Sequence, residues 1–328
     1  MSVAPWESFP AAPGRWIQPV GLLRLEGPDT RAFLHGQTSQ ALAMAAPGSW
    51  ARTCCISPTG RMRALAEVLV DESGAWLAIT AGDAEAVRLA FDRVLFPADR
   101  VELGTLESGW LTTAVLPGPA ATRPEPEGGS WRALGGAEAQ AWLLGEGQLL
   151  VRGSDPLPPA ATEALPDALV QPAPLSPEAA ERWRLQRGLP AAPAELNDDT
   201  NPFELGLAPR VSLSKGCYVG QETLAKLATY DGVKQQLRRW FLPPGAGAAP
   251  SPGTRLQGPD GARAGVVTSS LALLDGEGHI GLALVRRGCL DQQELLPEEG
   301  AAGAALRIST PEAFVPPPVG AGSQAGSR

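Results

Sequence analysis

Two stretches rich in proline and glycine divide this chain and limit how its segments can fold together. They cover residues 116–129 (LPGPAATRPEPEGG) and 153–177 (GSDPLPPAATEALPDALVQPAPLSP). Proline lacks the backbone N–H that helices and central strands need, so neither stretch predicts a long regular element. We expect both to be loops or linkers between lobes, and a chain of 328 residues to form two or three domains.

Ahead of the first linker, strand patterns alternate with helix patterns. Residues 21–25 predict a strand, and a helix capped by Asp29 or Thr30 follows it. Residues 58–60 (PTG) predict a hairpin turn, and a third strand is expected after residues 73–74. The regular strand–helix–strand rhythm of a doubly wound sheet does not appear, so we expect an α+β fold.

Two longer segments carry helix signals of their own. Residues 82–96 predict an amphipathic helix whose apolar side chains recur at helical spacing at Ala86, Leu89, Ala90 and Val94. Ser176 predicts the N-cap of a second helix, with Pro177 in its first turn.

After residue 236 the sequence changes to short strand patterns between Gly/Pro turns, with no clear helix signal. These strands are expected at residues 236–244, 262–271, 278–288 and 305–310. We therefore predict a core over residues 1–236, a small C-terminal β-barrel over 237–316, and a disordered tail over 317–328.

Composition restricts the class of protein. The chain is 44% hydrophobic and 19% charged, as soluble globular proteins are, and no apolar run reaches the roughly 18–20 residues that span a bilayer. Four cysteines in so long a chain do not predict a disulfide scaffold, and the N-terminal residues show no secretory signal. We therefore expect a cytoplasmic protein without a membrane partner. A net charge of −8 argues against general nucleic-acid binding.

One window, residues 212–230 (SLSKGCYVGQETLAKLATY), differs from the rest of the chain. It holds both tyrosines and two of the three lysines, and the third, Lys234, lies four residues after it. The basic residues of this region could form a local basic face, or simply a solvated surface stretch. They are Lys215, Lys226, Lys234, Arg238 and Arg239.

Cys217 is the candidate catalytic thiol of this window, with Lys215 as its partner. The Lys215 ammonium could stabilise a thiolate and so lower the pKa of the thiol. Gly216 and Gly220 permit a tight turn that would present the thiol. The alternative is that Cys217 is a small buried hydrophobe, as free cysteines often are.

Residues 215–222, KGCYVGQE, resemble the K-G-C-[YF]-x-G-Q-E signature of the YgfZ family. Those are folate-binding proteins that support iron–sulfur enzymes and are related to the aminomethyltransferase (T-protein) of the glycine cleavage system. Besides Lys215 and Cys217, the matching signature residues are Gly216, Tyr218, Gly220, Gln221 and Glu222. Other stretches resemble family segments in the same order, so that the resemblance covers nearly the whole chain: residues 25–40, 54–69, 184–190 and 201–207, and the C-terminal strands.

The resemblance implies two interlocked α+β lobes and a small C-terminal β-barrel, three domains around a central cavity. Tetrahydrofolate, or a one-carbon derivative of it, is the implied cofactor in that cavity, with Cys217 near it. Gln186 and Glu204 are the implied folate contacts. Gln186 stands where relatives often place a glutamate. The alternative is that Gln186 is an exposed helix residue with no contact to folate.

The implied function is that of an accessory factor for the assembly or repair of iron–sulfur proteins. Its partners would be iron–sulfur enzymes or their assembly machinery. Two alternatives stay open. One is a folate-dependent methyl- or aminomethyltransferase acting on a protein or RNA. Transfer RNA (tRNA) is the one nucleic acid retained as a candidate partner. The other is a folate-gated scaffold that docks partners through the signature loop.

The glycine-cleavage reaction itself is not expected. Aminomethyltransferases carry an acidic pair in the strand after the central glycine. Here Arg63, Ala64 and Leu65 occupy that region, and Glu67 falls later, so the group that would orient an aminomethyl donor is missing.

Other site chemistries find little support. A cysteine protease needs a histidine beside its thiol, and the chain has only His35 and His279. No C-x-x-C or H-x-x-x-H spacing exists, so no metal site is predicted. Cys54 and Cys55 are expected to be strand residues that face opposite ways.

Overall fold

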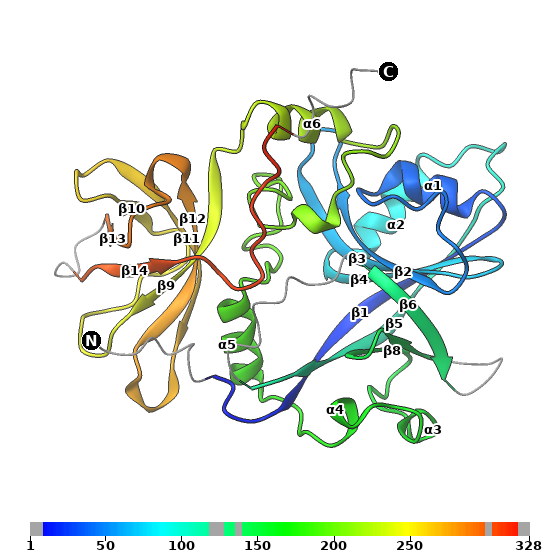
Figure 1. Ribbon diagram of the computed structural model, residues 1–328, viewed down its shortest axis with the longest axis horizontal. Helices are drawn as coiled ribbons and strands as arrows, with labels where there is room; N and C mark the ends of the chain where they lie inside the picture. Colours follow the sequence, from blue (N-terminus) through cyan, green and yellow to red (C-terminus); the bar gives the residue numbers. More distant parts are fainter. Residues whose placement is uncertain (1–8, 118–127, 135–139, 299–303, 321–328) are drawn as a thin grey trace.

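The computed structural model describes residues 9–117, 128–134, 140–298 and 304–320. Helices and strands are mixed along the chain, and the strands form two sheets that both close into barrels (Figure 1). Every strand pair within these sheets is antiparallel. The mixture of helices and strands confirms the expected α+β class.

The first barrel contains eight strands: β1 (Gly14–Glu26), β2 (Ser49–Ile56), β3 (Met62–Val70), β4 (Gly74–Gly82), β5 (Glu102–Val115), β6 (Gly128–Leu134), β7 (Ala141–Leu144) and β8 (Gln148–Arg152). Two helices lie between these strands in the chain, α1 (Thr30–Gln37) after β1 and α2 (Ala84–Asp92) after β4. The helices that follow the barrel are α3 (Pro159–Thr162), α4 (Asp167–Val170), α5 (Pro177–Arg187), η2 (Ala208–Arg210) and α6 (Gln221–Thr229). The strand order is β1-β4-β3-β2-β6-β7-β8-β5, and pairing of β5 with β1 closes the barrel. The expected hairpin is β2–β3, whose turn is fixed by a hydrogen bond from the Gly60 amide to the Ser57 carbonyl.

The second barrel contains six strands in the order β10-β11-β12-β9-β14-β13. Its elements are β9 (Gln235–Leu242), β10 (Arg255–Gln257), β11 (Arg263–Ala272), η3 (Leu274–Gly276), β12 (His279–Arg286), η4 (Arg287–Cys289), β13 (Glu294–Pro297) and β14 (Leu306–Ser309). The four strands expected from sequence correspond to β9, β11, β12 and β14. The sequence patterns missed β10 and β13, which have only three and four residues.

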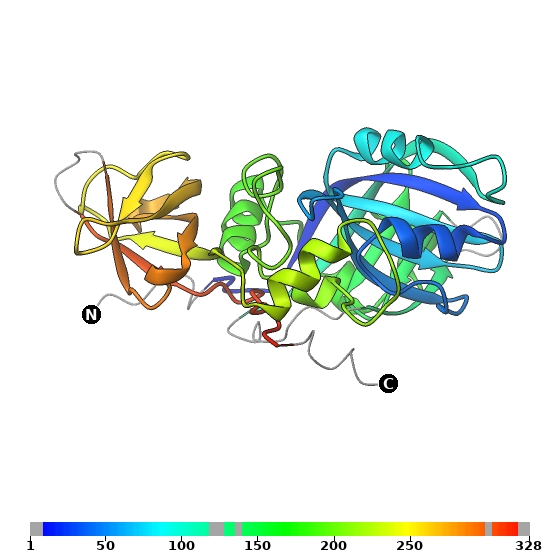
Figure 2. The ribbon, with the colours of Figure 1, turned by 90° about the horizontal axis from the view of Figure 1, so that it is seen from above.

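A single hydrophobic core joins the two barrels. It combines Cys54 and Leu65 of the first barrel with Leu185 of α5, Leu224 of α6 and Phe241 of the second barrel. Figure 2 shows α5 and its neighbouring loops between the two barrels. The barrels are therefore attached to each other by continuous packing and not only by a linker.

The C-terminal strap, which we define as residues 310–320, runs from β14 back towards α6 (Figure 1). The amides of Ala313, Val315 and Gly320 donate in turn to the carbonyls of Arg187, Gly206 and Ala228. The predicted disordered tail begins inside this strap, at residue 317, and residues 321–328 of it lie outside the described residues. The strap thus connects the second barrel to α5 and to α6.

Two expectations about helices had different outcomes. Helix α5 begins as predicted, with the Ser176 side chain accepting a hydrogen bond from the Ala179 amide. Helix α2 exists, but the predicted apolar face was wrong, because its buried residues are Val87 and Phe91. Phe91 packs edge-on against Phe33 of α1 at 5.4 Å. The four residues expected to be buried are exposed: Ala86, Leu89, Ala90 and Val94.

The two linkers also differ from simple loops. Residues 118–127 of the first lie outside the described residues, and its last two residues begin β6. The second contains the short helices α3 and α4, and it pairs with β1 where the Leu175 amide donates to the Arg15 carbonyl.

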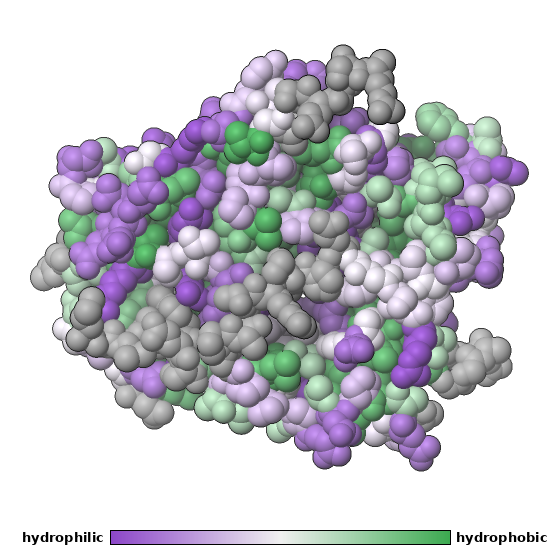
Figure 3. All heavy atoms as spheres, viewed as in Figure 1, coloured by the Kyte–Doolittle hydropathy of each residue, from purple (hydrophilic) through white to green (hydrophobic). Residues whose placement is uncertain are grey.

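Figure 3 shows hydrophobic and hydrophilic residues intermingled over one face of both barrels. Within the part of the chain that the structure describes, no helix has the length and apolar character to cross a membrane.

Candidate functional site

The signature loop, residues 212–222, connects η2 to α6 and is attached to the C-terminal end of α1. Near its start the Ser212 amide donates to the Ser39 carbonyl at 2.9 Å, and later the Val219 amide donates to the Gly36 carbonyl at 3.0 Å. The loop therefore follows the end of α1 closely.

Lys215 fixes the middle of the loop. Its ammonium donates to the carbonyl of His35, to that of Thr38 at 2.6 Å and to that of Gln40 at 2.8 Å. The negative end of the α1 dipole lies among these carbonyls, which favours a cation there. The ammonium also lies over the ring of Tyr218, 4.2 Å from its centre, where a cation–π attraction adds to the hydrogen bonds.

This geometry gives Lys215 partners other than the Cys217 thiolate that we expected. An ammonium has three N–H groups, and three carbonyls accept from it. Burial lowers the pKa of Lys215 to about 7, while the three carbonyl acceptors favour the charged form and act in the opposite direction. Lys215 is therefore a residue that positions the loop.

Cys217 is exposed, so the alternative of a small buried hydrophobe was wrong. The neighbouring Gly216 also faces open space, since a Cβ there would meet no atom within 4 Å. The loop thus presents the thiol to solvent, where a large molecule can reach it. The assignment of Cys217 as a catalytic residue stays a prediction.

Gly220 allows the loop to turn sharply into α6. Its φ is +79°, a left-handed conformation that side chains other than glycine rarely adopt. A Cβ at this position would lie 2.7 Å from the Ser57 carbonyl oxygen and 2.8 Å from the Ile56 Cδ1. The glycine is needed because the loop packs directly on the β2–β3 hairpin.

The remaining signature residues have structural or surface positions. Tyr218 is buried, and burial raises the pKa of its hydroxyl. Gln221 donates to the Lys215 carbonyl at 3.4 Å. Glu222 is exposed and pairs with Lys226 at 2.6 Å, one helical turn away.

The basic face, one of the two alternatives for these residues, is not assembled as one surface. Lys215 and Arg238 are buried. Arg239 donates to Ser309 and to the Gln186 carbonyl at the junction of α5 with the second barrel. Only two of the five basic residues, Lys226 and Lys234, are exposed.

A cavity of about 350 Å³ lies between the first barrel and α5. Its walls come from β1, β2, β3, β4, β5, β8, α5, the turn after α5, and η2. Trp16 and Trp183 meet there with ring centres 5.1 Å apart. Gln148 and Thr113 add polar groups and are hydrogen-bonded to each other at 3.0 Å. The charged lining residues are Arg52, Glu67, Arg184 and Arg210.

Glu67 is a cavity residue that the sequence reasoning set aside. It is buried, and its Oε2 accepts a hydrogen bond from the Trp50 indole at 2.7 Å. Its Oε1 lies 3.4 Å from the Arg52 Nε and 3.6 Å from an Arg210 nitrogen. Strand alternation could have revealed it, because Leu65 and Glu67 lie two residues apart on β3 and both line the cavity.

The two predicted folate contacts do not line this cavity. Gln186 is buried, which corrects the alternative of an exposed helix position, and its amide donates to the Phe9 carbonyl at 2.9 Å and to Glu312 at 3.2 Å. Glu204 is buried and accepts from the Asn201 amide at 3.0 Å, and burial raises the pKa of its carboxyl.

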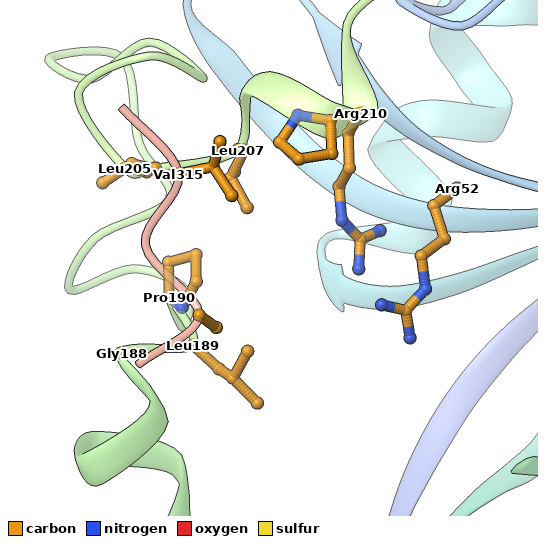
Figure 4. A pocket seen from close by; sticks show the side chains of 11 residues that line it. Arg52, Gly188, Leu189, Pro190, Leu205, Leu207, Arg210 and Val315 are labelled. Atoms are coloured by element: carbon orange, nitrogen blue, oxygen red, sulfur yellow. The ribbon is translucent and has the colours of Figure 1, made fainter. Parts of the chain in front are cut away.

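The cavity and the signature loop are adjacent along the chain, but no residue of the loop lines the cavity. Arg210 lines the cavity, and its carbonyl accepts from the Ser39 hydroxyl at 2.6 Å, beside the start of the loop. Cys217 is not among the lining residues. A smaller cavity of about 20 Å³, room for one water molecule, shares Arg52 and Arg210 and is bordered by Val315 of the strap (Figure 4).

The two adjacent cysteines behave as predicted. Cys54 belongs to the core that joins the barrels, and Cys55 belongs to the core beneath α1 and α2, so they face opposite sides of β2. Burial raises the pKa of Cys54 to about 11 and that of Cys55 to about 12, which makes both thiols unreactive. Among the described residues, no group of three His, Cys, Asp or Glu side chains could hold a metal ion.

Comparison with known proteins gives the fold. The glycine cleavage system aminomethyltransferase T from Bartonella henselae superposes with a TM-score of 0.68, covering 93% of this chain and 87% of that one at 18% identity. The chain has the fold of this aminomethyltransferase. The resemblance to the aminomethyltransferase fold inferred from sequence is thereby confirmed, whereas membership of the YgfZ family stays a prediction.

No family model matches the chain. A protein of Arabidopsis thaliana named "Putative transferase, chloroplastic" is 30% identical over 281 residues, 81% of this chain. The chain spans 63% of the length of that relative.

Proposed function

We propose that this protein binds tetrahydrofolate, or a one-carbon derivative of it, in the 350 Å³ cavity and serves iron–sulfur proteins through the exposed Cys217. The observation that carries the proposal is the cavity itself, between the first barrel and α5 of a chain with an aminomethyltransferase fold. Its volume lies within the roughly 300–1,000 Å³ typical of small-molecule sites.

The lining residues fit the chemistry of a folate. Trp16 and Trp183 offer aromatic surface for a planar pterin ring. Gln148, Thr113 and Glu67 offer the donors and acceptors that orient such a ring. When bound, the folate supplies a one-carbon unit or a site for one. The chain's own part is to bind the ligand, orient it and keep water away.

The position of Cys217 supports a partner that is a macromolecule. The thiol is exposed on a loop held in place by Lys215, and it does not line the cavity. A partner protein can therefore approach the thiol while the cavity is filled. This separation supports the accessory role for iron–sulfur enzymes over direct chemistry between the thiol and the folate.

A second candidate is a folate-dependent methyl- or aminomethyltransferase acting on a protein or RNA. Glu67 favours it, because this buried carboxylate lies in the cavity although the family's acidic pair is missing. The name of the Arabidopsis relative points the same way. In this case a one-carbon folate would be consumed as the acceptor is modified, which the accessory role does not require.

Calorimetric titration with tetrahydrofolate tests the shared first step. We expect the wild type and Cys217→Ser to bind equally. Thr80→Trp, which fills the cavity, should abolish binding, and Ala43→Trp on an exposed loop should not. Absence of binding by the folded wild type would end both candidates.

Complementation of a strain that lacks the protein separates the candidates. If the accessory role is correct, Cys217→Ser fails to restore iron–sulfur enzyme activity, while Cys289→Ser restores it. Full restoration by Cys217→Ser would contradict the role of the thiol. Loss of docking with loop variants but not with Cys217→Ser would instead support the scaffold alternative.

A further inference from the structure

Gln18 lies where the interior of the first barrel changes from polar to apolar. It lines the cavity, whereas Val20, which faces the same way two residues further along β1, belongs to an apolar core of the first barrel. In the register of β1 and β5, Gln18 stands opposite Leu111 of that core, and Trp16 stands opposite Thr113. Gln18 is therefore the polar residue of β1 that borders the apolar floor of the cavity.

The Gln18 amide is available to a ligand. Within the described ranges, its two N–H donors and its carbonyl oxygen have no hydrogen-bond partner. The indole N–H of Trp183 likewise donates to no described residue, although this side chain is only 9% exposed. The Thr113 oxygen accepts from Gln148 at 3.0 Å, which leaves its own O–H to donate. Polar groups at the wall of a cavity gain free energy when a ligand supplies the missing partner.

The charged groups that line the cavity already have partners. Arg184 lies 2.7 Å from Glu181 and 3.4 Å from Glu195. Glu67 lies 3.4 Å and 3.6 Å from nitrogens of the other two lining arginines. A charged group of a ligand would have to disturb one of these buried ion pairs, which costs free energy. The groups left for a ligand are therefore neutral.

From these contacts we infer that Gln18 is a specificity-determining residue of the cavity, whose amide pairs with an adjacent donor and acceptor on the edge of an uncharged planar heterocycle. The inference rests on the proposed function, in which this heterocycle is the pterin ring of a folate. An amide presents a donor and an acceptor side by side, as the edge of such a ring does. The charged glutamate tail of the folate then points away from Gln18.

Gln18→Met tests the pairing, because methionine keeps the length of the side chain and removes the amide. The probes are 6-methyltetrahydropterin, 5-formyltetrahydrofolate and the tail fragment p-aminobenzoylglutamate, with binding measured by calorimetry. We expect both heterocyclic probes to bind about tenfold more weakly or worse, and by the same factor, because each loses the same hydrogen bonds. Binding of the tail fragment should not change.

Thermal unfolding without ligand separates recognition from a structural role. Gln18→Met should unfold at the temperature of the wild type or above it, because no hydrogen bond within the described protein is lost. A residue that only supported the barrel would lower the unfolding temperature together with the affinity. Gln293→Met, which changes an exposed glutamine of the second barrel, is the matched control and should alter neither quantity.

The failures are distinguishable. If Gln18→Met binds both heterocyclic probes as the wild type does, or if it weakens the tail fragment as strongly, the role of Gln18 is overturned while folate binding stands. A fall in affinity that comes with a fall in unfolding temperature also overturns it. If the wild type binds none of the probes, the proposed function fails as well. Gln18→Leu, which also removes the amide, replaces Gln18→Met if that variant does not fold, with the same expected results.

Discussion

At Lys215, burial and hydrogen bonding act on the ammonium in opposite directions. We predict that Lys215→Met destabilises the protein by about 3 kcal/mol, because three carbonyls lose a charged donor in a buried place. Urea unfolding measures this change. Because Lys215 no longer holds the loop in this variant, the reaction rate of Cys217 with a thiol reagent should rise. The rate is measured in a Cys289→Ser background, which removes the other accessible thiol.

Lys226→Met is the control for Lys215, because Lys226 is exposed and pairs only across the surface of α6. We expect it to leave both the unfolding midpoint and the thiol reaction unchanged. A Lys215→Met protein as stable as the wild type would show that the ammonium does not hold the loop.

His35 makes the same region sensitive to acid. Its Nδ1 accepts from the amides of Leu42 and Ala43, and burial and the nearby Lys215 lower its pKa below 6.5. The folded state therefore binds fewer protons than the unfolded state just below pH 6.5. Stability is complete above that pH and falls as the pH drops towards the pKa of the folded state.

Thermal unfolding between pH 5 and pH 7.5 measures this acid sensitivity. We expect a steeper loss for the wild type than for His35→Gln, which cannot titrate. His279→Gln, which changes the chain's other histidine, should follow the wild type. Equal pH dependence in all three proteins would remove His35 as the cause.

Single residues show where sequence reasoning succeeds. Cys54 and Cys55 alternate on one strand, so their opposite directions follow from local geometry alone. The partners of Lys215 do not, because they lie at the end of α1 and in the residues just after it, far away in sequence. Glu67 lies two residues after Leu65 on β3, so strand alternation could have placed it in the cavity, but its pairing with Arg210 of η2 could not be read from local sequence.

At the scale of elements, the turn into α6 can be tested with two glycines of the same loop. We predict that Gly220→Ala destabilises the protein by roughly 1–3 kcal/mol, because φ is +79° and the added Cβ would meet the Ser57 carbonyl. Gly216→Ala is the control, since its surroundings are open and its φ is not left-handed. Urea unfolding compares the two, and equal effects would contradict the packing argument.

Most helices and strands were predictable from the sequence. The buried face of helix α2 and the shortest strands were not. A helix pattern fixes the period of α2, and packing into the core beneath it decides that Val87 and Phe91 are the buried residues. Strands as short as β10 are held mainly by their neighbours in the barrel. Such strands lack a sequence pattern long enough to be recognised.

At the scale of the whole molecule, the two barrels close through pairing of strands that are far apart in the sequence. No local sequence pattern predicts such pairing. Strand β1 pairs on one side with β4 and on the other with β5, and β9 lies between β12 and β14. The resemblance of residues 215–222 to a known signature indicated the fold where periodicity could not. The cavity between the first barrel and α5 is a consequence of that arrangement.

The strap connects the second barrel to α5, and Glu312 is the strap residue that makes the charged contacts between them. Glu312 lies 3.6 Å from Arg187 of α5 and 3.5 Å from Arg239 of β9, and it accepts from Gln186. We predict that Glu312→Gln destabilises the protein by about 3 kcal/mol, because two largely buried guanidinium groups lose a shared carboxylate.

Limited proteolysis and urea unfolding test the role of Glu312. The variant should be cleaved faster within the strap than the wild type, since the second barrel and α5 are then joined less firmly. Glu298→Gln, which removes a surface pair with Arg255, is the control and should change stability by less than about 0.5 kcal/mol. If the two variants are cleaved equally slowly, hydrophobic packing alone holds the barrels together and the strap is only a covering segment.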